Sequence, residues 1–246
     1  MLINKNVAVH TNKVSLVPYC KHHVAKYHGW MKDPDLQVAT ASEPLTLEAE
    51  YAMQRSWRTD SDKLTFISCL AQPDGQTSQR EDIASAIGDV NLFVVTDEEE
   101  SGELVIAGEV EIMVAERQNR YQGTGRAALL VFLKYVLAHE TEILKEYFST
   151  ARDNQSQDKF AYLRAKINET NGQSLRLFES VGFERSDVTP NFFGEWELRK
   201  RFSIQDIEKQ MEEKMVSGYR EVSYPYEEEG SQEMKVRANS SSTDKP

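Results

Sequence analysis

The sequence has few cysteines and no long apolar run. Only two of its 246 residues are cysteine, Cys20 and Cys69, and they lie far apart without the spacing of a metal-binding motif. Isolated cysteines of this kind predict free thiols in a reducing compartment. No segment approaches the roughly 20 apolar residues of a membrane-spanning helix, and residues 1–6 lack the apolar stretch of a secretory signal. We therefore expect a cytoplasmic protein without a membrane partner.

Positive charge is also scarce. The chain has 29 lysines and arginines against 40 aspartates and glutamates, which gives a net charge of −11 and a pI of about 5.1. Because nucleic-acid binding needs a concentrated basic surface, this composition argues against nucleic acid as a partner. The excess of acidic residues has two interpretations: it keeps the chain soluble, or it favours cationic partners such as amines and lysine-rich peptides.

Hydrophobic patterning predicts one mixed α/β domain over residues 14–200. Apolar runs predict strands at residues 14–18, 64–70, 87–95, 104–114, 160–167, 184–188 and 192–199. Helical spacing of apolar residues predicts helices at residues 21–30, 46–57, 126–139 and 171–180. Polar stretches at 72–81 and 149–158 predict loops. Because only a short polar segment joins the strands at 87–95 and 104–114, we expect an antiparallel meander.

The character of the chain changes after residue 200. Apolar residues at helical spacing predict one amphipathic helix within residues 201–223: Ile204, Ile207, Met211 and Met215. Residues 224–246 are rich in Glu, Ser and Lys with almost nothing to bury, which predicts a disordered tail. The chain therefore divides into a domain at 14–200, a helical extension at 201–223 and a tail at 224–246.

A loop with two glycines follows the strand at 104–114 and opens the next helix. The unpaired amide groups at a helix N-terminus, with the positive end of the helix dipole behind them, suit a pyrophosphate. Gly123 and Gly125 have no Cβ atom, so a phosphate can approach the backbone closely. Arg120 and Arg126 add positive charge to the same segment. The sequence therefore predicts a phosphate-binding loop.

The same loop has two other interpretations. Gly123-x-Gly125-x-x-Ala128 also satisfies the fingerprint of a dinucleotide-binding oxidoreductase. In that fold the first glycine comes almost directly after the strand, whereas a polar loop at 115–122 intervenes here. The preceding strands also look antiparallel, unlike those of a βαβ unit. A purely structural glycine turn is the remaining alternative.

A second motif follows the strand at 160–167, and with it the sequence resembles the GNAT acetyltransferases. Their loop pattern, Arg/Gln-x-x-Gly-x-Gly/Ala, is matched by Arg120, Gly123 and Gly125. Their later pattern, Asn-x-x-Ser/Ala-x-x-x-Phe/Tyr-x-x-x-Gly-Phe, is matched by Asn171, Ser174, Phe178, Gly182 and Phe183. Segments 30–32, 41–48, 50–54 and 88–93 look like the N-acetyltransferase 9-like branch of this superfamily. The resemblance covers residues 14–199.

The resemblance implies a fold and a cosubstrate. In the family, a mixed and mostly antiparallel sheet of six or seven strands is flanked by helices and splays open between its fourth and fifth strands. Acetyl-CoA lies in this V-shaped gap. Here the backbone of three residues would hold its acetyl and pantetheine part: Ile112, Met113 and Val114. The pyrophosphate would lie on the loop, at Arg120, Tyr121, Gln122, Gly123, Thr124, Gly125 and Arg126. Asn171 would bind the pantetheine arm, a role compatible with capping its helix.

The resemblance also implies a reaction, in which a neutral amine attacks the thioester directly. Many relatives use a strand glutamate as the base. Glu109, eleven positions before Arg120, occupies that register, and Glu111 lies on the same strand face. Both are equally compatible with ordinary exposed carboxylates. Phe178 stands where many members have a tyrosine that protonates the thiolate, so another donor, water or an unassisted thiolate is required.

The acceptor and the alternative function follow from the same resemblance. The branch is associated with protein acetylation and with tubulin, which implies a protein or peptide amine as acceptor and tubulin as a partner. The alternative is a non-catalytic acetyl-CoA-binding or scaffolding protein, suggested by Phe178 and the acidic C-terminal extension. We expect no metal site, because no carboxylate or thiol spacing completes a ligand set with His22, His23 and His28.

Overall fold

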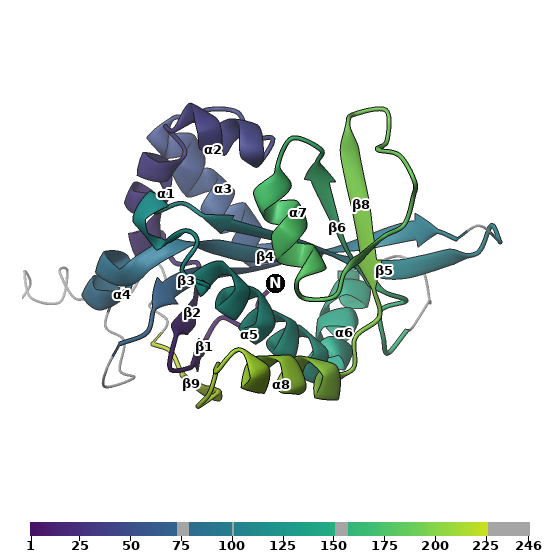
Figure 1. Cartoon of the computed structure of the whole chain (residues 1–246). Helices are drawn as coiled ribbons and strands as arrows, with labels where there is room; N and C mark the ends of the chain where they lie inside the picture. Colours follow the sequence, from purple (N-terminus) through teal and green to yellow (C-terminus); the bar gives the residue numbers. More distant parts are fainter. Residues whose placement is uncertain (73–78, 100, 151–156, 226–246) are drawn as a thin grey trace, which may run out of the picture.

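One mixed sheet organises the residues that this computed structural model describes, which are 1–72, 79–99, 101–150 and 157–225 (Figure 1). The strands are β1 (Val7–His10), β2 (Val14–Pro18), β3 (Lys63–Leu70), β4 (Ala86–Glu98), β5 (Leu104–Val114), β6 (Leu163–Asn168), β7 (Glu184–Arg185), β8 (Glu195–Lys200) and β9 (Arg220–Ser223). The helices are α1 (Val24–Trp30), α2 (Pro34–Ala39), α3 (Leu47–Thr59), α4 (Gln79–Ser85), α5 (Thr124–Ala138), α6 (Glu140–Thr150), α7 (Gly172–Glu179) and α8 (Ile204–Glu213).

The expected number of strands was wrong. In the described residues the sheet has nine strands, in the order β7-β8-β6-β5-β4-β3-β2-β1-β9. The two unexpected strands, β1 and β9, pair antiparallel with each other at one edge of the sheet. β1 has four residues and β9 exposes most of its side chains, so neither carries a clear alternating apolar pattern. The mixed α/β class itself is confirmed.

β5 has very different contacts with its two neighbours. It pairs antiparallel with β4 along its whole length, as expected for a meander. With β6 it makes one short parallel contact, at Gly108 opposite Leu163 and Glu109 opposite Arg164. Figure 1 shows β6 and β8 running steeply across the direction of β4 and β5. The splay that was expected between the fourth and fifth strands is therefore present between β5 and β6. These are the fourth and fifth strands when the unexpected β1 is left out of the count.

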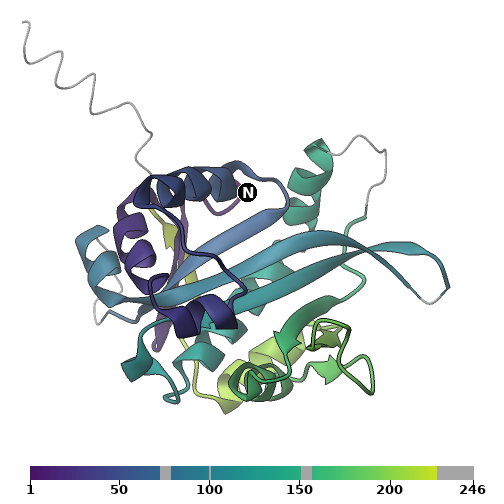
Figure 2. The same cartoon turned by 90° about the horizontal axis from the view of Figure 1, so that it is seen from above.

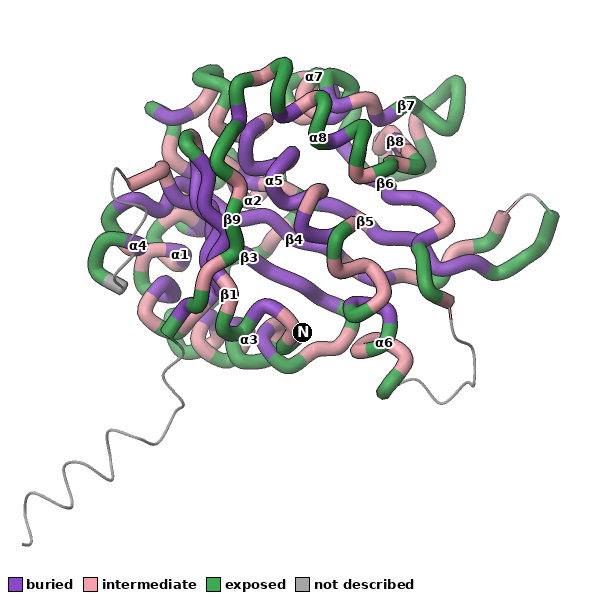
Figure 3. Tube along the Cα trace, turned by 90° about the horizontal axis from the view of Figure 1, so that it is seen from below, coloured by how far each residue is buried: buried purple, intermediate pink, exposed green. Residues whose placement is uncertain are grey.

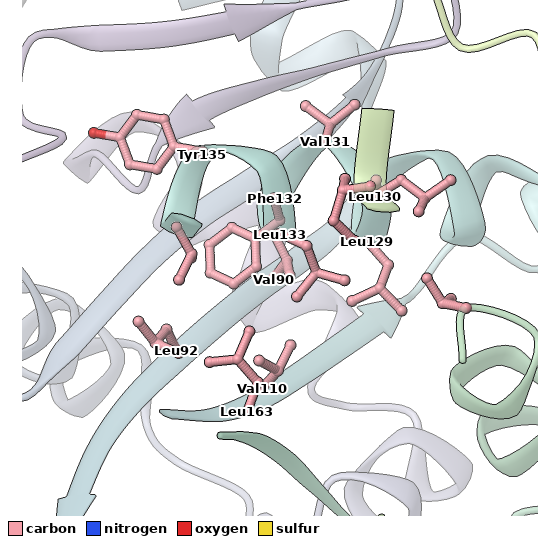
Figure 4. Packing of buried hydrophobic residues seen from close by; sticks show 14 of the residues in the cluster. Val90, Leu92, Val110, Leu129, Leu130, Val131, Phe132, Leu133, Tyr135 and Leu163 are labelled. Atoms are coloured by element: carbon pink, nitrogen blue, oxygen red, sulfur yellow. The ribbon is translucent and has the colours of Figure 1, made fainter. Parts of the chain in front are cut away.

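Helix α5 forms the centre of the hydrophobic core on one face of the sheet. Leu129, Phe132 and Leu133 pack against apolar residues of β4 and β5 such as Val90 and Val110 (Figure 4). α5 is apolar around most of its circumference because α8 covers the side that faces away from the sheet. α1 and α3 cover the opposite face, and Figure 2 shows α3 and α8 on opposite sides of the β4–β5 hairpin. The central strands are buried, whereas the tip of that hairpin is exposed (Figure 3).

Three helices were not predicted. They are α2, α4 and α6, each of which buries only one or two large apolar side chains or begins in a polar stretch. α4 begins inside the loop expected at 72–81, of which residues 73–78 lie outside the described part. The loop expected at 149–158 falls mainly on residues 151–156, which also lie outside it. No helix of the described segments is long and apolar enough to cross a bilayer.

The C-terminal region differs from expectation at two side chains. Met215 was expected on the apolar stripe of the last helix, but α8 ends at Glu213 and Met215 is 72 % exposed. Tyr224, the first residue of the expected tail, is 2 % exposed, and its hydroxyl donates a hydrogen bond to Asp82 over 2.6 Å. The rest of that tail, 226–246, lies outside the described part. The division of the chain after residue 200 stays a prediction.

Gly88 of β4 lies directly against the backbone of Met113 and Val114 in β5. A Cβ atom added at Gly88 would lie 1.8 Å from the carbonyl oxygen of Met113. The adjacent Ile87 carbonyl accepts hydrogen bonds from the amides of Ala115 at 2.8 Å and Glu116 at 3.2 Å. The glycine therefore fixes the point at which β5 ends and the following loop begins.

Substitution of Gly88 by alanine should lower the free energy of unfolding by about 3 kcal/mol, because the new methyl group forces β4 away from β5. Urea unfolding measures this change. Gly29→Ala in α1 is the matched control, since no atom lies within 4 Å of its new Cβ, and it should change the free energy by less than about 1 kcal/mol. Equal effects of the two substitutions would contradict the close approach at Gly88.

Candidate functional site

The N-terminus of α5 presents unpaired backbone amides. Gly123 is the N-cap in a left-handed conformation, with φ of +80°, and no side chain caps the helix. The first intrahelical bond runs from the amide of Ala127 to the carbonyl of Gly123, at 2.9 Å. The amides of Thr124, Gly125 and Arg126 precede this bond, and the helix dipole adds positive potential to them. This end of α5 is therefore suited to an anion.

The side chain of Arg120 holds the loop before α5 in place. Its Nε donates to the carbonyl of Val114 at 2.8 Å, and its Nη2 donates to the carbonyl of Ala115 at 3.2 Å. Further along the loop, the hydroxyl of Thr124 donates to the carbonyl of Asn119. The guanidinium group of Arg120 thus connects the end of β5 to the loop, in addition to placing a positive charge near the start of α5.

Helix α7 packs beside the same loop. The Arg126 Nε donates to the hydroxyl of Ser180 at 2.9 Å, and the Gln173 side chain donates to the hydroxyl of Tyr121, which is 81 % exposed. A Cβ atom at Gly125 would lie 3.2 Å from Val114 and 3.7 Å from Leu177. The start of α5 is therefore wedged between the end of β5 and α7, and the two sequence motifs meet there.

Asn171 and Phe178 have clear structural roles in α7. Asn171 is the N-cap, and its Oδ1 accepts a hydrogen bond from the amide of Ser174 at 3.2 Å. Its Nδ2 donates to no group in the described part of the chain, so it can serve a ligand. Phe178 is buried, and its ring lies 5.1 Å from that of Phe183. Phe178 belongs to the core and supplies no proton donor.

The last residues of β5 have a free edge. Ile112, Met113 and Val114 pair with β4 on one side. On the other side, β6 pairs only with Gly108 and Glu109, so no strand of the described residues covers the edge at 112–114. An uncovered strand edge presents amide and carbonyl groups that can pair with an extended ligand. This edge ends where the loop toward α5 begins.

The sheet face covered in part by α1 and α3 carries a polar cluster. The strand register aligns Lys63, Phe93 and Glu109 in one row across β3, β4 and β5. The next two rows are Thr65, Asn91 and Glu111, then Ile67, Asp89 and Met113. Side chains in these rows share one face, since each row is two residues from the next. We call the polar members of these rows the polar floor: Lys63, Thr65, Asp89, Asn91, Glu109 and Glu111.

Hydrogen bonds fix the buried part of the polar floor. Asp89 is 2 % exposed, and its Oδ2 accepts hydrogen bonds from the Tyr27 hydroxyl at 3.2 Å and the Asn91 Nδ2 at 3.0 Å. The Asn91 Oδ1 accepts a hydrogen bond from the Thr65 hydroxyl at 2.7 Å. Burial raises the pKa of the Asp89 carboxyl above its usual value. These contacts tie α1 to the centre of the sheet.

The two glutamates of β5 have different environments. The Glu109 Oε2 accepts a hydrogen bond from Arg164 Nε at 2.8 Å, and Lys166 Nζ lies 3.8 Å away. Glu111 forms no ion pair within 4.0 Å in the described residues. Solvent reaches Glu111, but surrounding protein removes part of its hydration and raises the pKa of its carboxyl to about 7. Glu111 can therefore exchange a proton near neutral pH, whereas Glu109 is committed to its cations.

Arg164 connects four strands at the base of the splay. It lies 2.5 Å from Asp97 of β4, 2.8 Å from Glu109 of β5 and 3.6 Å from Glu197 of β8. Tyr162 also donates a hydrogen bond to Asp97. Sequence reasoning did not identify this cluster, because its members are spread over residues 97–199 and only strand pairing brings them together.

This geometry has counterparts among known proteins. The model of the acetyltransferase (GNAT) domain family matches residues 13–184. The N-acetyltransferase 9-like protein of Schizosaccharomyces pombe is 38 % identical over 215 residues, which cover 75 % of this chain and 92 % of that protein. The chain belongs to the GNAT acetyltransferase family, in its N-acetyltransferase 9-like branch. It is an N-acetyltransferase.

Further comparisons agree with this assignment. The alpha/beta-tubulin-N-acetyltransferase 9 of Drosophila melanogaster is 40 % identical over 183 residues, covering 74 % of this chain and 81 % of that protein. The crystal structure of a GCN5-related N-acetyltransferase from Brucella melitensis matches the fold with a TM-score of 0.56 at 12 % identity, over 87 % of this chain and 86 % of that one. The antiparallel order of β3, β4 and β5 excludes the dinucleotide-binding interpretation of the GNAT glycine loop.

In the described residues, three side chains of metal-binding type lie close together. The ligand atoms of Cys20, His22 and His23 lie within 4.8 Å of one another. However, the Nδ1 of His23 accepts the amide hydrogen of Cys20 at 3.1 Å, so its Nε2 carries the ring proton. A metal would bind this ring either at Nδ1, by displacing the Cys20 amide, or at Nε2, after a change of tautomer. His28 instead lies 3.9 Å from Glu50. The absence of a metal site stays a prediction.

Replacing Glu111 by glutamine should stabilise the protein at pH 8. The carboxyl pKa rises from 4.5 to about 7 on folding, so this residue's stabilising effect is full below pH 4.5 and is lost as the pH rises through 7. Glutamine removes that loss. We expect a gain of about 1 kcal/mol, less than the full pKa change implies because solvent reaches the carboxylate.

Thermal unfolding at pH 8 and pH 5 tests this expectation, and the gain should be much smaller at pH 5. Glu109→Gln is the matched control, since it breaks the ion pair with Arg164 and should destabilise the protein at pH 8. A lower melting temperature of Glu111→Gln at pH 8 would contradict the raised pKa of the Glu111 carboxyl.

Proposed function

We propose that this chain transfers the acetyl group of acetyl-CoA to an amine of a protein or peptide. Two features support the donor site: the amides at the start of α5, which suit a pyrophosphate, and the uncovered edge of β5, which suits the amide-containing pantetheine arm. Space is open beside Gly123, where no atom lies within 4 Å of its missing Cβ. The proposed contacts are Ile112, Met113, Val114, Arg120, Tyr121, Gln122, Gly123, Thr124, Gly125, Arg126 and Asn171.

We infer that Glu111 is the general base of this reaction. The acceptor nitrogen must lose its proton before it attacks the thioester carbon, and a carboxylate with a pKa near 7 can accept that proton directly or through water. The C–N bond then forms as the C–S bond breaks, and coenzyme A leaves as a thiolate. The second proton that the nitrogen loses as the amide forms passes to that thiolate through water. Glu109, the other candidate, is less suited because Arg164 and Lys166 hold it as an ion-paired carboxylate. Phe178 cannot protonate the thiolate.

The acceptor that we propose is a protein amine, with tubulin as the first candidate. The relative from Drosophila carries tubulin in its name, and it shares 40 % identity with this chain. The carboxylates of the polar floor and the net charge of −11 favour a cationic acceptor over a nucleic acid. We place the reaction in the cytoplasm. A non-catalytic scaffold is disfavoured, because relatives that match about three quarters of this chain are named as N-acetyltransferases.

An acetylation assay tests this function. Purified protein, labelled acetyl-CoA and either tubulin or a panel of amine-bearing peptides should yield labelled acceptor. Glu111→Gln should lower kcat/KM by about 100-fold or more, the usual contribution of a general base, with the affinity for acetyl-CoA unchanged. The kcat/KM of the unsubstituted protein should fall with an apparent pKa of about 7 as the pH is lowered.

The control is again Glu109→Gln. Its kcat/KM is compared after correction for the protein that its lower stability leaves unfolded. If Glu111→Gln transfers acetyl groups as fast as the unsubstituted protein, the assignment of the base is wrong. If no acceptor is labelled although acetyl-CoA binds, the protein has the scaffolding role instead.

A further inference from the structure

Lys63 is a buried cation on the sheet face that carries Glu111. The residue is 6 % exposed and begins β3. Its Nζ lies 2.9 Å from the ring centroid of Trp57 and 4.3 Å from that of Phe93. A desolvated ammonium gains more from aromatic faces than an exposed one. The two rings therefore hold the positive charge at a defined place beside the polar floor.

This cation acts on Glu111 without forming a direct ion pair. No carboxylate of the described chain lies within 4.0 Å of the Lys63 Nζ. At longer range its charge is attracted mainly by Asp89 and Glu111, and also by Asp60 and Asp62 in the turn after α3. Burial lowers the pKa of Lys63 to about 8, so the side chain remains mostly charged at neutral pH.

The groups around Glu111 have opposite effects on the ionisation of its carboxyl. Loss of hydration disfavours its ionised form most, and the negative charges of Asp89 and Glu109 add to this effect. Glu109 is largely compensated by Arg164 and Lys166 of β6, its own neighbours. Lys63 is the cation that favours the ionised form of Glu111.

Two neutral groups affect the ionisation of Glu111 indirectly, through their hydrogen bonds to Asp89. The Tyr27 hydroxyl from α1 and the Asn91 amide both donate hydrogen bonds to that carboxylate. These bonds stabilise the negative charge of Asp89 against its burial. In its ionised form, Asp89 disfavours ionisation of Glu111 and attracts Lys63.

We propose that Lys63 is a positioning residue for acetyl transfer, whose charge favours the ionised form of Glu111 and so extends the activity of the enzyme to lower pH. This inference rests on the proposed role of Glu111 as the base. Trp57 and Phe93 serve it by restraining the ammonium.

The pH dependence of kcat/KM for Lys63→Met and Lys63→Arg tests the proposal. Methionine retains the packing against Trp57 without the charge. The acidic limb, the part of the profile where kcat/KM falls as the pH is lowered, should therefore move upward by about one pH unit, as expected for loss of a nearby opposite charge. Arginine keeps the charge, so its acidic limb should stay where it is. Asp89→Asn should move the limb downward, because it removes a negative charge and keeps an oxygen for Tyr27 and Asn91.

A second readout separates this inference from the proposed function. Carbon-13 NMR of the Glu111 carboxyl in protein without substrates should show the same upward displacement in Lys63→Met. If the variant titrates like the unsubstituted protein, or if its activity falls equally at every pH, the inference is overturned while the proposed function stands. If the unsubstituted protein transfers no acetyl group, the proposed function fails. Lys63→Gln, checked by thermal unfolding, replaces Lys63→Met if the latter does not fold.

Discussion

The unequal pairing of β5 with its two neighbours is the constraint on which the site depends. β5 is bonded to β4 along its whole length, which fixes the direction of every side chain on both faces of the strand. Its contact with β6 is limited to two residue pairs, so the edge at 112–114 stays open. A rigid strand with one open edge can hold an extended ligand and present side chains to it at the same time.

Different interactions stabilise the two ends of the short contact between β5 and β6. At the base, Arg164 draws Asp97, Glu109 and Glu197 together and keeps β6 and β8 attached to the meander. At the open end, α5 and α7 meet through Arg126 and the tight approach at Gly125. The gap is therefore bounded by an ion cluster on one side and by a helix N-terminus on the other. One glutamate of β5 belongs to the ion cluster, and the next one on that face is free for chemistry.

Local sequence patterns predicted the elements that carry the two motifs. The strand at 104–114 matches β5, and Asn171 caps α7 as its residue type suggested. These features depend on periodicity and capping, which act over a few residues. β1 and β9 could not be predicted in the same way, because their pairing joins residues more than 200 positions apart.

The candidate site was predictable only in part, for the same reason. The spacing of Glu109 and Glu111 placed both on one face, but only the fold reveals that Arg164 pairs with Glu109. Likewise, Arg120 was expected to face a phosphate, and its bonds to Val114 and Ala115 depend on how the loop folds back. The place of Lys63 between two rings depends on contacts from α3 and β4, which no local pattern in β3 encodes.

The claim that backbone amides at the start of α5 hold the pyrophosphate is tested most directly by calorimetric binding of coenzyme A to Gly123→Glu and Gly123→Gln. Both side chains impose the same strain at a φ of +80° and enter the same open space, but only glutamate brings a negative charge to the amides. The account predicts that Gly123→Glu binds coenzyme A about tenfold or more weakly than Gly123→Gln. Equal affinities of the two folded variants would contradict it.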